Sequence, residues 1–71
     1  MVAIGDTVLY LTHETPEQSP LLTPAVLTGN REDGDVLLLQ GAFYLGYVVS
    51  QLWTPDAPEP MQPGQYKEIE P

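Results

Sequence analysis

Few side chains in this 71-residue chain belong to the types that perform catalysis at neutral pH. Its one histidine, His13, stands beside Glu14 in a proline-flanked segment, and Ser19 and Ser50 have no predicted base nearby. A nucleophile needs a base within hydrogen-bond reach, and the base needs a third group to orient it. The sequence therefore predicts that the protein is not an enzyme, that it uses no cofactor and that His13 is a solvated loop residue.

A second candidate chemistry is calcium binding. Asn30, Glu32, Asp33 and Asp35 place hard oxygen ligands around Gly34, and Ca²⁺ prefers such ligands. The run lacks the spacing and the distant glutamate of an EF-hand loop. We interpret it as a solvated turn whose carboxylates keep the strand ends from pairing with foreign edges, and we predict no bound metal.

A third candidate is an aromatic groove. Phe43, Tyr44, Tyr47 and Trp53 could line a groove for a proline-rich ligand, supplied by the chain's own terminus or by that of a neighbouring copy. The alternative places Phe43 and Trp53 in the core and the two tyrosines at its rim. We favour the alternative, because so small a core needs its aromatic side chains.

The elements that position these residues are predicted to be β-strands. The strongest signal is a pair of apolar runs within Pro24–Gln40, joined by a polar turn at Asp33 and Gly34, which is typical of a β-hairpin. Four successive apolar residues from Val36 to Leu39 predict burial on both faces of their strand. No segment predicts a helix, so the expected fold class is all-β, a small antiparallel barrel.

The expected strand boundaries follow from the apolar runs and the residues that interrupt them. A first loop covers residues 12–23, and residues 50–53 are expected to form a short turn before a final strand. Gly46 marks a bend in the fourth strand. The four strands are expected over residues 7–11, 24–28, 36–39 and 43–49.

The composition changes at Thr54, after which four prolines occur within ten residues and exclude both a helix and an interior strand. We therefore expect two parts: a barrel over residues 1–53 and an extended, proline-rich, acidic arm over residues 54–71. Fixing the arm costs on the order of 25 kcal/mol of conformational entropy, so it is expected to order against another molecule. Its deletion is expected to leave the barrel folded.

Size and charge limit the classes of function. A chain this short buries only about 60% of its unfolded surface, and without cysteine it has no disulfide to compensate, so association is the available route to stability. The formal charge of −8 disfavours direct nucleic-acid binding. No apolar stretch is long enough to cross a membrane, and the first residues do not resemble a signal peptide.

Residues 5–53 resemble a family of very small tailed-bacteriophage proteins with SH3-like barrels. The resemblance is carried by Gly5-Asp6-Thr7-Val8-Leu9-Tyr10, by Pro24-Ala25-Val26, and by the Asp33-Gly34 turn before Val36–Leu39. The tail departs from the family, which commonly ends in a cluster rich in Trp and Pro. The resemblance implies an SH3-like fold and a phage-encoded virion or accessory protein.

Two functions are expected from this setting. The first is a structural virion protein, a capsid decoration (cement) or minor capsid protein that is assembled in the host cytoplasm. It is expected to bind the assembled shell through its barrel and its C-terminal arm, with the major capsid protein or another virion protein as partner, and self-association is also expected. The second is an acidic inhibitor that occupies a basic site on a host protein. The residues expected to contact a partner are Leu21, Leu22, Tyr44, Tyr47, Trp53, Pro58, Pro60, Tyr66 and Ile69.

Overall fold

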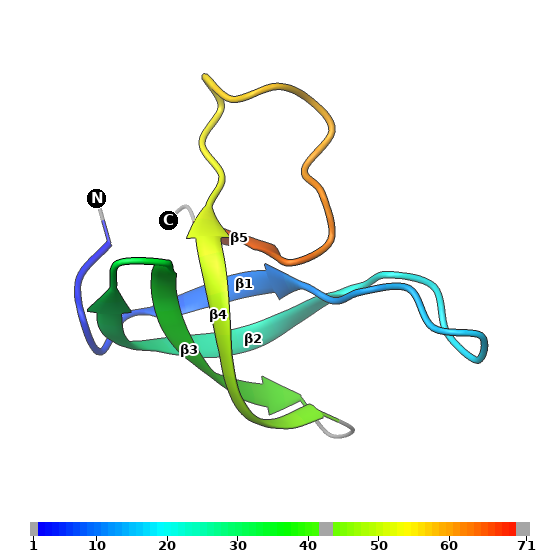
Figure 1. Ribbon diagram of the computed structural model, residues 1–71, viewed down its shortest axis with the longest axis horizontal. Coiled ribbons are helices and arrows are strands. Elements are labelled where there is room, and N and C mark those ends of the chain that lie inside the picture. Colours follow the sequence, from blue (N-terminus) through cyan, green and yellow to red (C-terminus); the bar gives the residue numbers. More distant parts are fainter. Residues whose placement is uncertain (1, 42–43, 70–71) are drawn as a thin grey trace.

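A computed structural model describes residues 2–41 and 44–69, and these residues form a closed five-stranded β-barrel without any helix (Figure 1). The all-β class expected from the sequence is therefore confirmed, and the barrel is of the small SH3-like kind. The strands are β1 (Thr7–Leu11), β2 (Leu22–Arg31), β3 (Gly34–Gly41), β4 (Tyr44–Leu52) and β5 (Gln65–Glu68).

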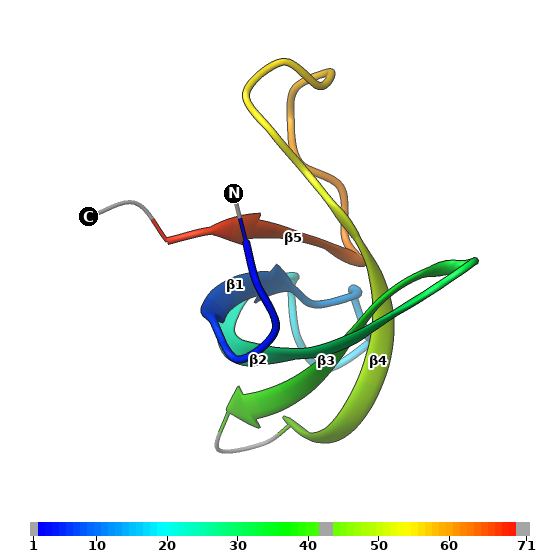
Figure 2. The same ribbon diagram turned by 90° about the vertical axis from the view of Figure 1, so that its left-hand side faces the viewer.

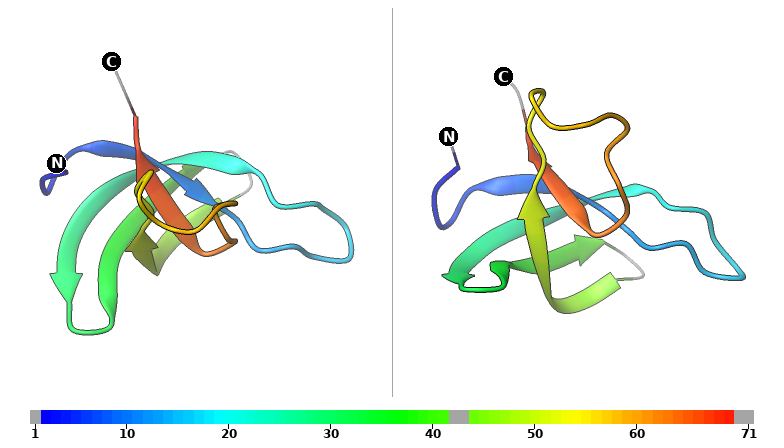
Figure 3. Two further views of the ribbon diagram at one scale, coloured as in Figure 1. Left: turned by 90° about the horizontal axis from the view of Figure 1, so that it is seen from above. Right: turned by 45° about the horizontal axis from the view of Figure 1, so that its top comes forward.

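The strands lie side by side in sequence order, and β5 closes the barrel between β4 and β1 (Figure 3). Pairs β1–β2, β2–β3, β3–β4 and β1–β5 are antiparallel. The β4–β5 pair is parallel, because the chain leaves β4 and returns beside it through a long loop. This closing contact is short, with only Gln51 opposite Gln65 and Leu52 opposite Tyr66.

The core fills the barrel interior and follows the alternation of the strands. Side chains at every second position point inward, and those between them point outward. Tyr66, Leu37 and Val8 are the largest apolar side chains that are fully buried. The complete core consists of Val8, Tyr10, Ala25, Leu27, Leu37, Leu39 and Tyr66, with Val2 and Val48 packed against it.

The hairpin expected within Pro24–Gln40 is present as β2 and β3, with Gly34 directly after its turn. Gly34 has a φ of 148°, and an added Cβ there would lie 2.7 Å from the Ser50 carbonyl oxygen, so glycine is required. The prediction for β3 was half right. Leu37 and Leu39 are buried inside the barrel, whereas Val36 and Leu38 are only half-buried on its outer face.

β2 begins at Leu22, two residues earlier than expected, so Pro24 lies inside a strand. The Leu27 amide donates to the Asp6 carbonyl oxygen, which directs alternate β2 backbone groups toward β1. Pro24 falls between those positions, so its backbone nitrogen faces the β3 side of the strand. The β2–β3 pairing ends at Ala25, so no β3 partner requires an N–H from Pro24. Proline is therefore tolerated in this strand.

The expected short turn over residues 50–53 is wrong, because residues 50–52 continue β4. The bend expected at Gly46 coincides with a positive φ of 121°. Ser50 is buried near the end of β4, and its hydroxyl donates to the Gly64 carbonyl oxygen at 2.7 Å. The added strand length carries β4 to its contact with β5.

The largest difference from the sequence-based expectation is β5. Residues 65–68 were assigned to the extended arm, but they pair with β1 and β4, and the Tyr66 side chain is fully buried in the core. The barrel is therefore completed by its own C-terminal segment. Burial of the Tyr66 ring and backbone pairing with β1 and β4 both stabilise the ordered segment.

A hydrogen-bond network at one end of the barrel holds β5 against the β2–β3 hairpin. The Tyr66 hydroxyl donates to Oδ2 of Asp35, and Asn30 donates through Nδ2 to Oδ1 of the same carboxylate at 2.6 Å. The other side of the hairpin turn is held by an exposed ion pair, Arg31 Nε to Asp33 Oδ1 at 3.2 Å. Three of the four residues considered as calcium ligands thus make contacts within the hairpin, namely Asn30, Asp33 and Asp35, and Asp35 also binds Tyr66 of β5.

The connection between β4 and β5 stands away from the barrel (Figures 1 and 2). We call residues 54–63 the acidic loop, since it carries Asp56 and Glu59, both exposed. The Trp53 indole N–H donates to the Pro58 carbonyl oxygen at 3.1 Å, and the Ala57 amide donates to the Thr54 carbonyl oxygen at 2.9 Å. These bonds fold the loop on itself, while its polar tip stays in water.

Candidate binding surfaces

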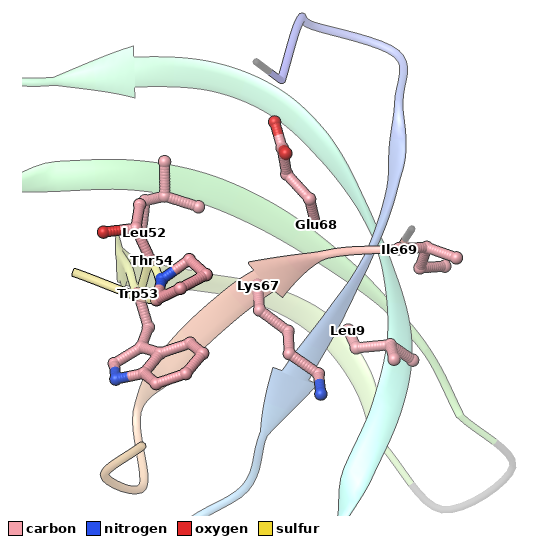
Figure 4. A pocket seen from close by; sticks show the side chains of 8 residues that line it. Leu9, Leu52, Trp53, Thr54, Lys67, Glu68 and Ile69 are labelled. Atoms are coloured by element: carbon pink, nitrogen blue, oxygen red, sulfur yellow. The ribbon is translucent and has the colours of Figure 1, made fainter. Parts of the chain in front are cut away.

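A groove lies on the outer side of β5, where the chain leaves β4 (Figure 4). It encloses about 570 Å³, a volume in the range of about 300–1,000 Å³ typical of ligand sites. We call it the β5 groove, and it is lined by Leu9, Leu52, Trp53, Thr54, Pro55, Lys67, Glu68 and Ile69.

Trp53 is fixed at one side of the β5 groove by two hydrogen bonds. Its backbone amide donates to the Tyr66 carbonyl oxygen at 2.7 Å, and its indole N–H donates to Pro58 in the acidic loop. With the indole N–H occupied, the ring contributes mainly apolar surface to the groove. Figure 4 shows the side chains of Leu9 and Ile69 on the opposite side.

Lys67 projects between these apolar walls (Figure 4). It is half-buried and lies opposite Leu9 in the β1–β5 register. The Glu68 side chain points to the other side of β5, as the alternation of a strand requires. The groove therefore combines one cationic group with aromatic and aliphatic surface, an arrangement able to hold an apolar segment that carries a carboxylate.

A second surface covers the outside of β2, β3 and β4. In the strand register Val36 lies opposite Val49 and Leu38 opposite Tyr47, and all four point away from the core. Tyr47 is 68% exposed and Val49 is 41% exposed. We call Val26, Val36, Leu38, Tyr47 and Val49 the outer patch; Val26 joins it because it lies opposite Leu38.

The expected partner residues fall into different places. Trp53 and Ile69 both line the β5 groove, on opposite sides, and Tyr47 lies in the outer patch. Leu22 begins β2, is 42% exposed and lies opposite Leu11, whereas Leu21 is half-buried beside it in the first loop. Pro58 and Pro60 are exposed in the acidic loop.

Two of the remaining expectations need comment. Tyr66 cannot contact a partner in this fold, because its side chain is fully buried, and its role as an anchor is fulfilled inside the barrel itself. The favoured alternative predicted Trp53 in the barrel core, and this prediction is wrong. Trp53 is half-buried and lines the β5 groove. Phe43 and the side chain of Tyr44 lie outside the described residues.

Sequence reasoning missed Lys67 and Leu9 as surface-forming residues. No local pattern marked Lys67 as part of a strand, because Tyr66 and Ile69 are three residues apart and do not follow the two-residue alternation of a strand. The four prolines before this segment also favoured an extended arm. Leu9 was expected only as part of the strand over residues 7–11, and the structure places it opposite Lys67 of β5, so that both line the groove.

A scan against protein-family models and searches among curated proteins and solved structures found no match to this chain. Within residues 2–41 and 44–69, no helix is long and apolar enough to cross a membrane.

Proposed function

We propose that this protein is a structural virion protein of a tailed bacteriophage, a capsid decoration or minor capsid protein that attaches to the assembled shell. The observation that supports attachment is the outer patch. Tyr47 and Val49 are exposed there, and they lie opposite the half-buried Leu38 and Val36 in adjacent cross-strand pairs. Apolar surface of this kind is typical of protein interfaces. The phage setting is supported by the resemblance of residues 5–53 described above.

The size and charge of the chain are consistent with such a role. A small acidic protein avoids the packaged nucleic acid and approaches a basic partner surface readily. Many copies on one particle then gain avidity from a modest interface on each copy.

The first test is the stoichiometry of the protein in purified particles of the encoding phage, measured by quantitative mass spectrometry. A decoration or minor capsid protein occurs at a fixed copy number in each particle. Its absence from the particle would contradict the proposal.

The second test uses Tyr47→Ser and, as a matched control, Ile4→Ser. The two wild-type side chains are 68% and 63% exposed, so neither change is expected to alter the free energy of unfolding by more than about 0.5 kcal/mol. Only Tyr47 lies in the outer patch. Shell occupancy is therefore expected to fall with Tyr47→Ser and to stay at the wild-type level with Ile4→Ser.

Ionic strength separates this proposal from the acidic inhibitor. Attachment through apolar side chains is expected to persist between about 0.05 and 0.5 M NaCl, whereas exposed charge pairs are screened over about 10 Å at 0.1 M. Binding that collapses over this range would favour an inhibitor that uses its acidic surface.

A further inference from the structure

We propose that the β5 groove binds the acidic loop of a second copy of this chain, in a reciprocal contact between two copies. The shell proposal uses the outer patch and leaves the β5 groove without a partner. The inference rests on the proposed function in one respect, namely that many copies of the chain come together on one particle. The contact brings Asp56 or Glu59 of one copy to Lys67 of the other.

The charge distribution supports an anionic occupant. The chain has only two cationic side chains against ten acidic ones. Arg31 is paired with Asp33 in an exposed ion pair, whereas Lys67 stands between the apolar walls of the groove. Partial removal from water strengthens the attraction between an ammonium and a carboxylate. The groove is therefore the place on this acidic protein where a carboxylate is favoured.

The groove walls indicate which side chains should flank the carboxylate in the bound segment. Trp53 presents an aromatic surface whose N–H is already bonded, and Leu9 and Ile69 supply aliphatic surface across from it. Proline rings pack well on such aromatic surface, and a proline-rich segment loses little conformational entropy when it binds. The occupant expected is a proline-rich segment in which acidic residues alternate with prolines.

The acidic loop has this chemistry. Its sequence from residue 55 to 61 is Pro-Asp-Ala-Pro-Glu-Pro-Met, and both carboxylates are exposed. Figures 1 and 2 show that the loop projects from the barrel, so its tip is accessible to another molecule. The protein therefore carries both a groove and a segment that matches it in charge and apolar character.

The position of the loop favours a two-fold contact. Thr54 and Pro55 belong both to the groove wall and to the base of the acidic loop, so the groove and the loop form one continuous surface. In a two-fold contact each copy offers the same surface, and a groove beside its matching loop meets this condition. One dimer would then contain two equivalent loop-to-groove contacts.

The first experiment is sedimentation equilibrium of the full chain with charge-reversed variants. Lys67→Glu alone and Asp56→Lys with Glu59→Lys are each expected to weaken the dimer at least about tenfold, because both place like charges in the contact. An equimolar mixture of the two variants is expected to restore a dimer, since each groove then meets a loop of opposite charge. Far-UV circular dichroism verifies that the variants are folded.

The matched control is Glu14→Lys with Glu17→Lys. These two residues are exposed in the first loop, so the control has the same net charge as the acidic-loop variant. It is expected to keep the wild-type dimer and to pair with Lys67→Glu more weakly than the acidic-loop variant does, because only one of the two contacts then joins opposite charges. A wild-type protein that stays monomeric at 1 mM overturns the proposal. So does a dimer that Lys67→Glu leaves unchanged, or a control that rescues as well as the acidic-loop variant.

The second experiment uses Trp53 as a reporter, because it is the one tryptophan of the chain and it lines the groove. A capped peptide with the sequence of residues 55–61 is titrated against dilute protein while indole fluorescence is recorded. Saturable quenching or an emission shift is expected, and a peptide with Asn and Gln in place of Asp and Glu is expected to bind about fivefold more weakly. No spectral change at millimolar peptide overturns the inference.

The outcomes remain separable from those of the shell proposal. Peptide binding by a protein that stays monomeric would assign the groove to an acidic, proline-rich segment of a different protein and overturn the second-copy contact. Failure of both experiments would leave the shell proposal intact, because that proposal is tested on Tyr47 in the outer patch.

Discussion

At the scale of single residues, Tyr66 is the side chain on which the fold depends most. It is fully buried, it fills the barrel beside residues from other strands, and its hydroxyl donates to Asp35. One residue thus joins the last strand to the central hairpin through both apolar packing and a charge-assisted hydrogen bond.

Tyr66→Phe is expected to lower the free energy of unfolding by about 1–2 kcal/mol. The change keeps the buried ring but removes the donor to Asp35, whose carboxylate then lacks one of its partners. Urea denaturation followed by circular dichroism measures the effect. Tyr47→Phe is the control, since Tyr47 is exposed, and its change should stay within about 0.5 kcal/mol. Equal effects from the two variants would contradict the role assigned to the hydroxyl.

A loss of stability in alkaline solution is the second expected result at this scale. Burial, followed by the hydrogen bond to Asp35, raises the pKa of Tyr66 above its ordinary value of 10.0, and burial also raises the pKa of Tyr10. The folded state therefore holds these protons at a pH where the unfolded chain releases them. The stabilisation is complete below pH 10 and is lost as the pH rises above it.

The measurement is the free energy of unfolding between pH 8 and pH 11, for the wild type and for Tyr66→Phe. The variant is expected to show a shallower decline above about pH 10, because one of the two shifted groups has been removed. Identical slopes for the two proteins would show that Tyr66 does not contribute to the alkaline transition.

At the scale of elements, β5 decides whether the sheet is a barrel. It pairs with β1 over Tyr66–Glu68 and contacts the end of β4, so its removal would leave two strand edges open and the core without the Tyr66 ring. Open edges and exposed apolar side chains favour aggregation. The segment that resembled a dispensable arm is therefore part of the folding unit.

Deletion of residues 54–71 is expected to prevent folding, which reverses the sequence-based expectation of a folded remainder. Far-UV circular dichroism and the dispersion of amide signals in an ¹H–¹⁵N NMR spectrum report the loss. A variant with a Gly-Ser segment of equal length in place of residues 55–62 keeps β5 and is expected to remain folded. A well-dispersed spectrum from the deletion would show that four strands suffice.

At the scale of the whole molecule, the main feature is the excess of negative over positive charge. A formal charge of −8 is spread over a barrel of 71 residues, with Arg31 and Lys67 as the only cationic side chains to compensate. Like charges at these separations repel each other in the folded state and less so in the expanded chain. Solution conditions that screen this repulsion should therefore stabilise the fold.

Raising NaCl from 0.01 to 0.15 M is expected to increase the free energy of unfolding by about 1 kcal/mol, or the Tm by about 4–8 °C for a domain of this size. Differential scanning calorimetry measures the shift at constant protein concentration. A charge-reduced variant, Glu14→Lys with Glu17→Lys, is expected to show a smaller salt dependence. A Tm that falls with salt would indicate that attractive ion pairs outweigh the repulsion.

The sequence by itself determined the parts of the fold that depend on local patterns. The hairpin around Asp33 and Gly34 and the strand over residues 7–11 follow from alternation and from turn residues, and both are present. At Gly46, where a bend was expected, the backbone has a positive φ within β4. Composition likewise determined the acidic character of the surface.

Only the tertiary structure decided the closure of the barrel and the position of the β5 groove. Both depend on contacts between distant residues, such as Tyr66 with Asp35 and Lys67 with Leu9, and no local propensity encodes such pairs. The prolines before β5 made it resemble a free tail, although they shape only the loop that leads to it. The strand is ordered by contacts with distant parts of the chain, because its backbone pairs with β1 and β4 and its Tyr66 ring is buried in the core.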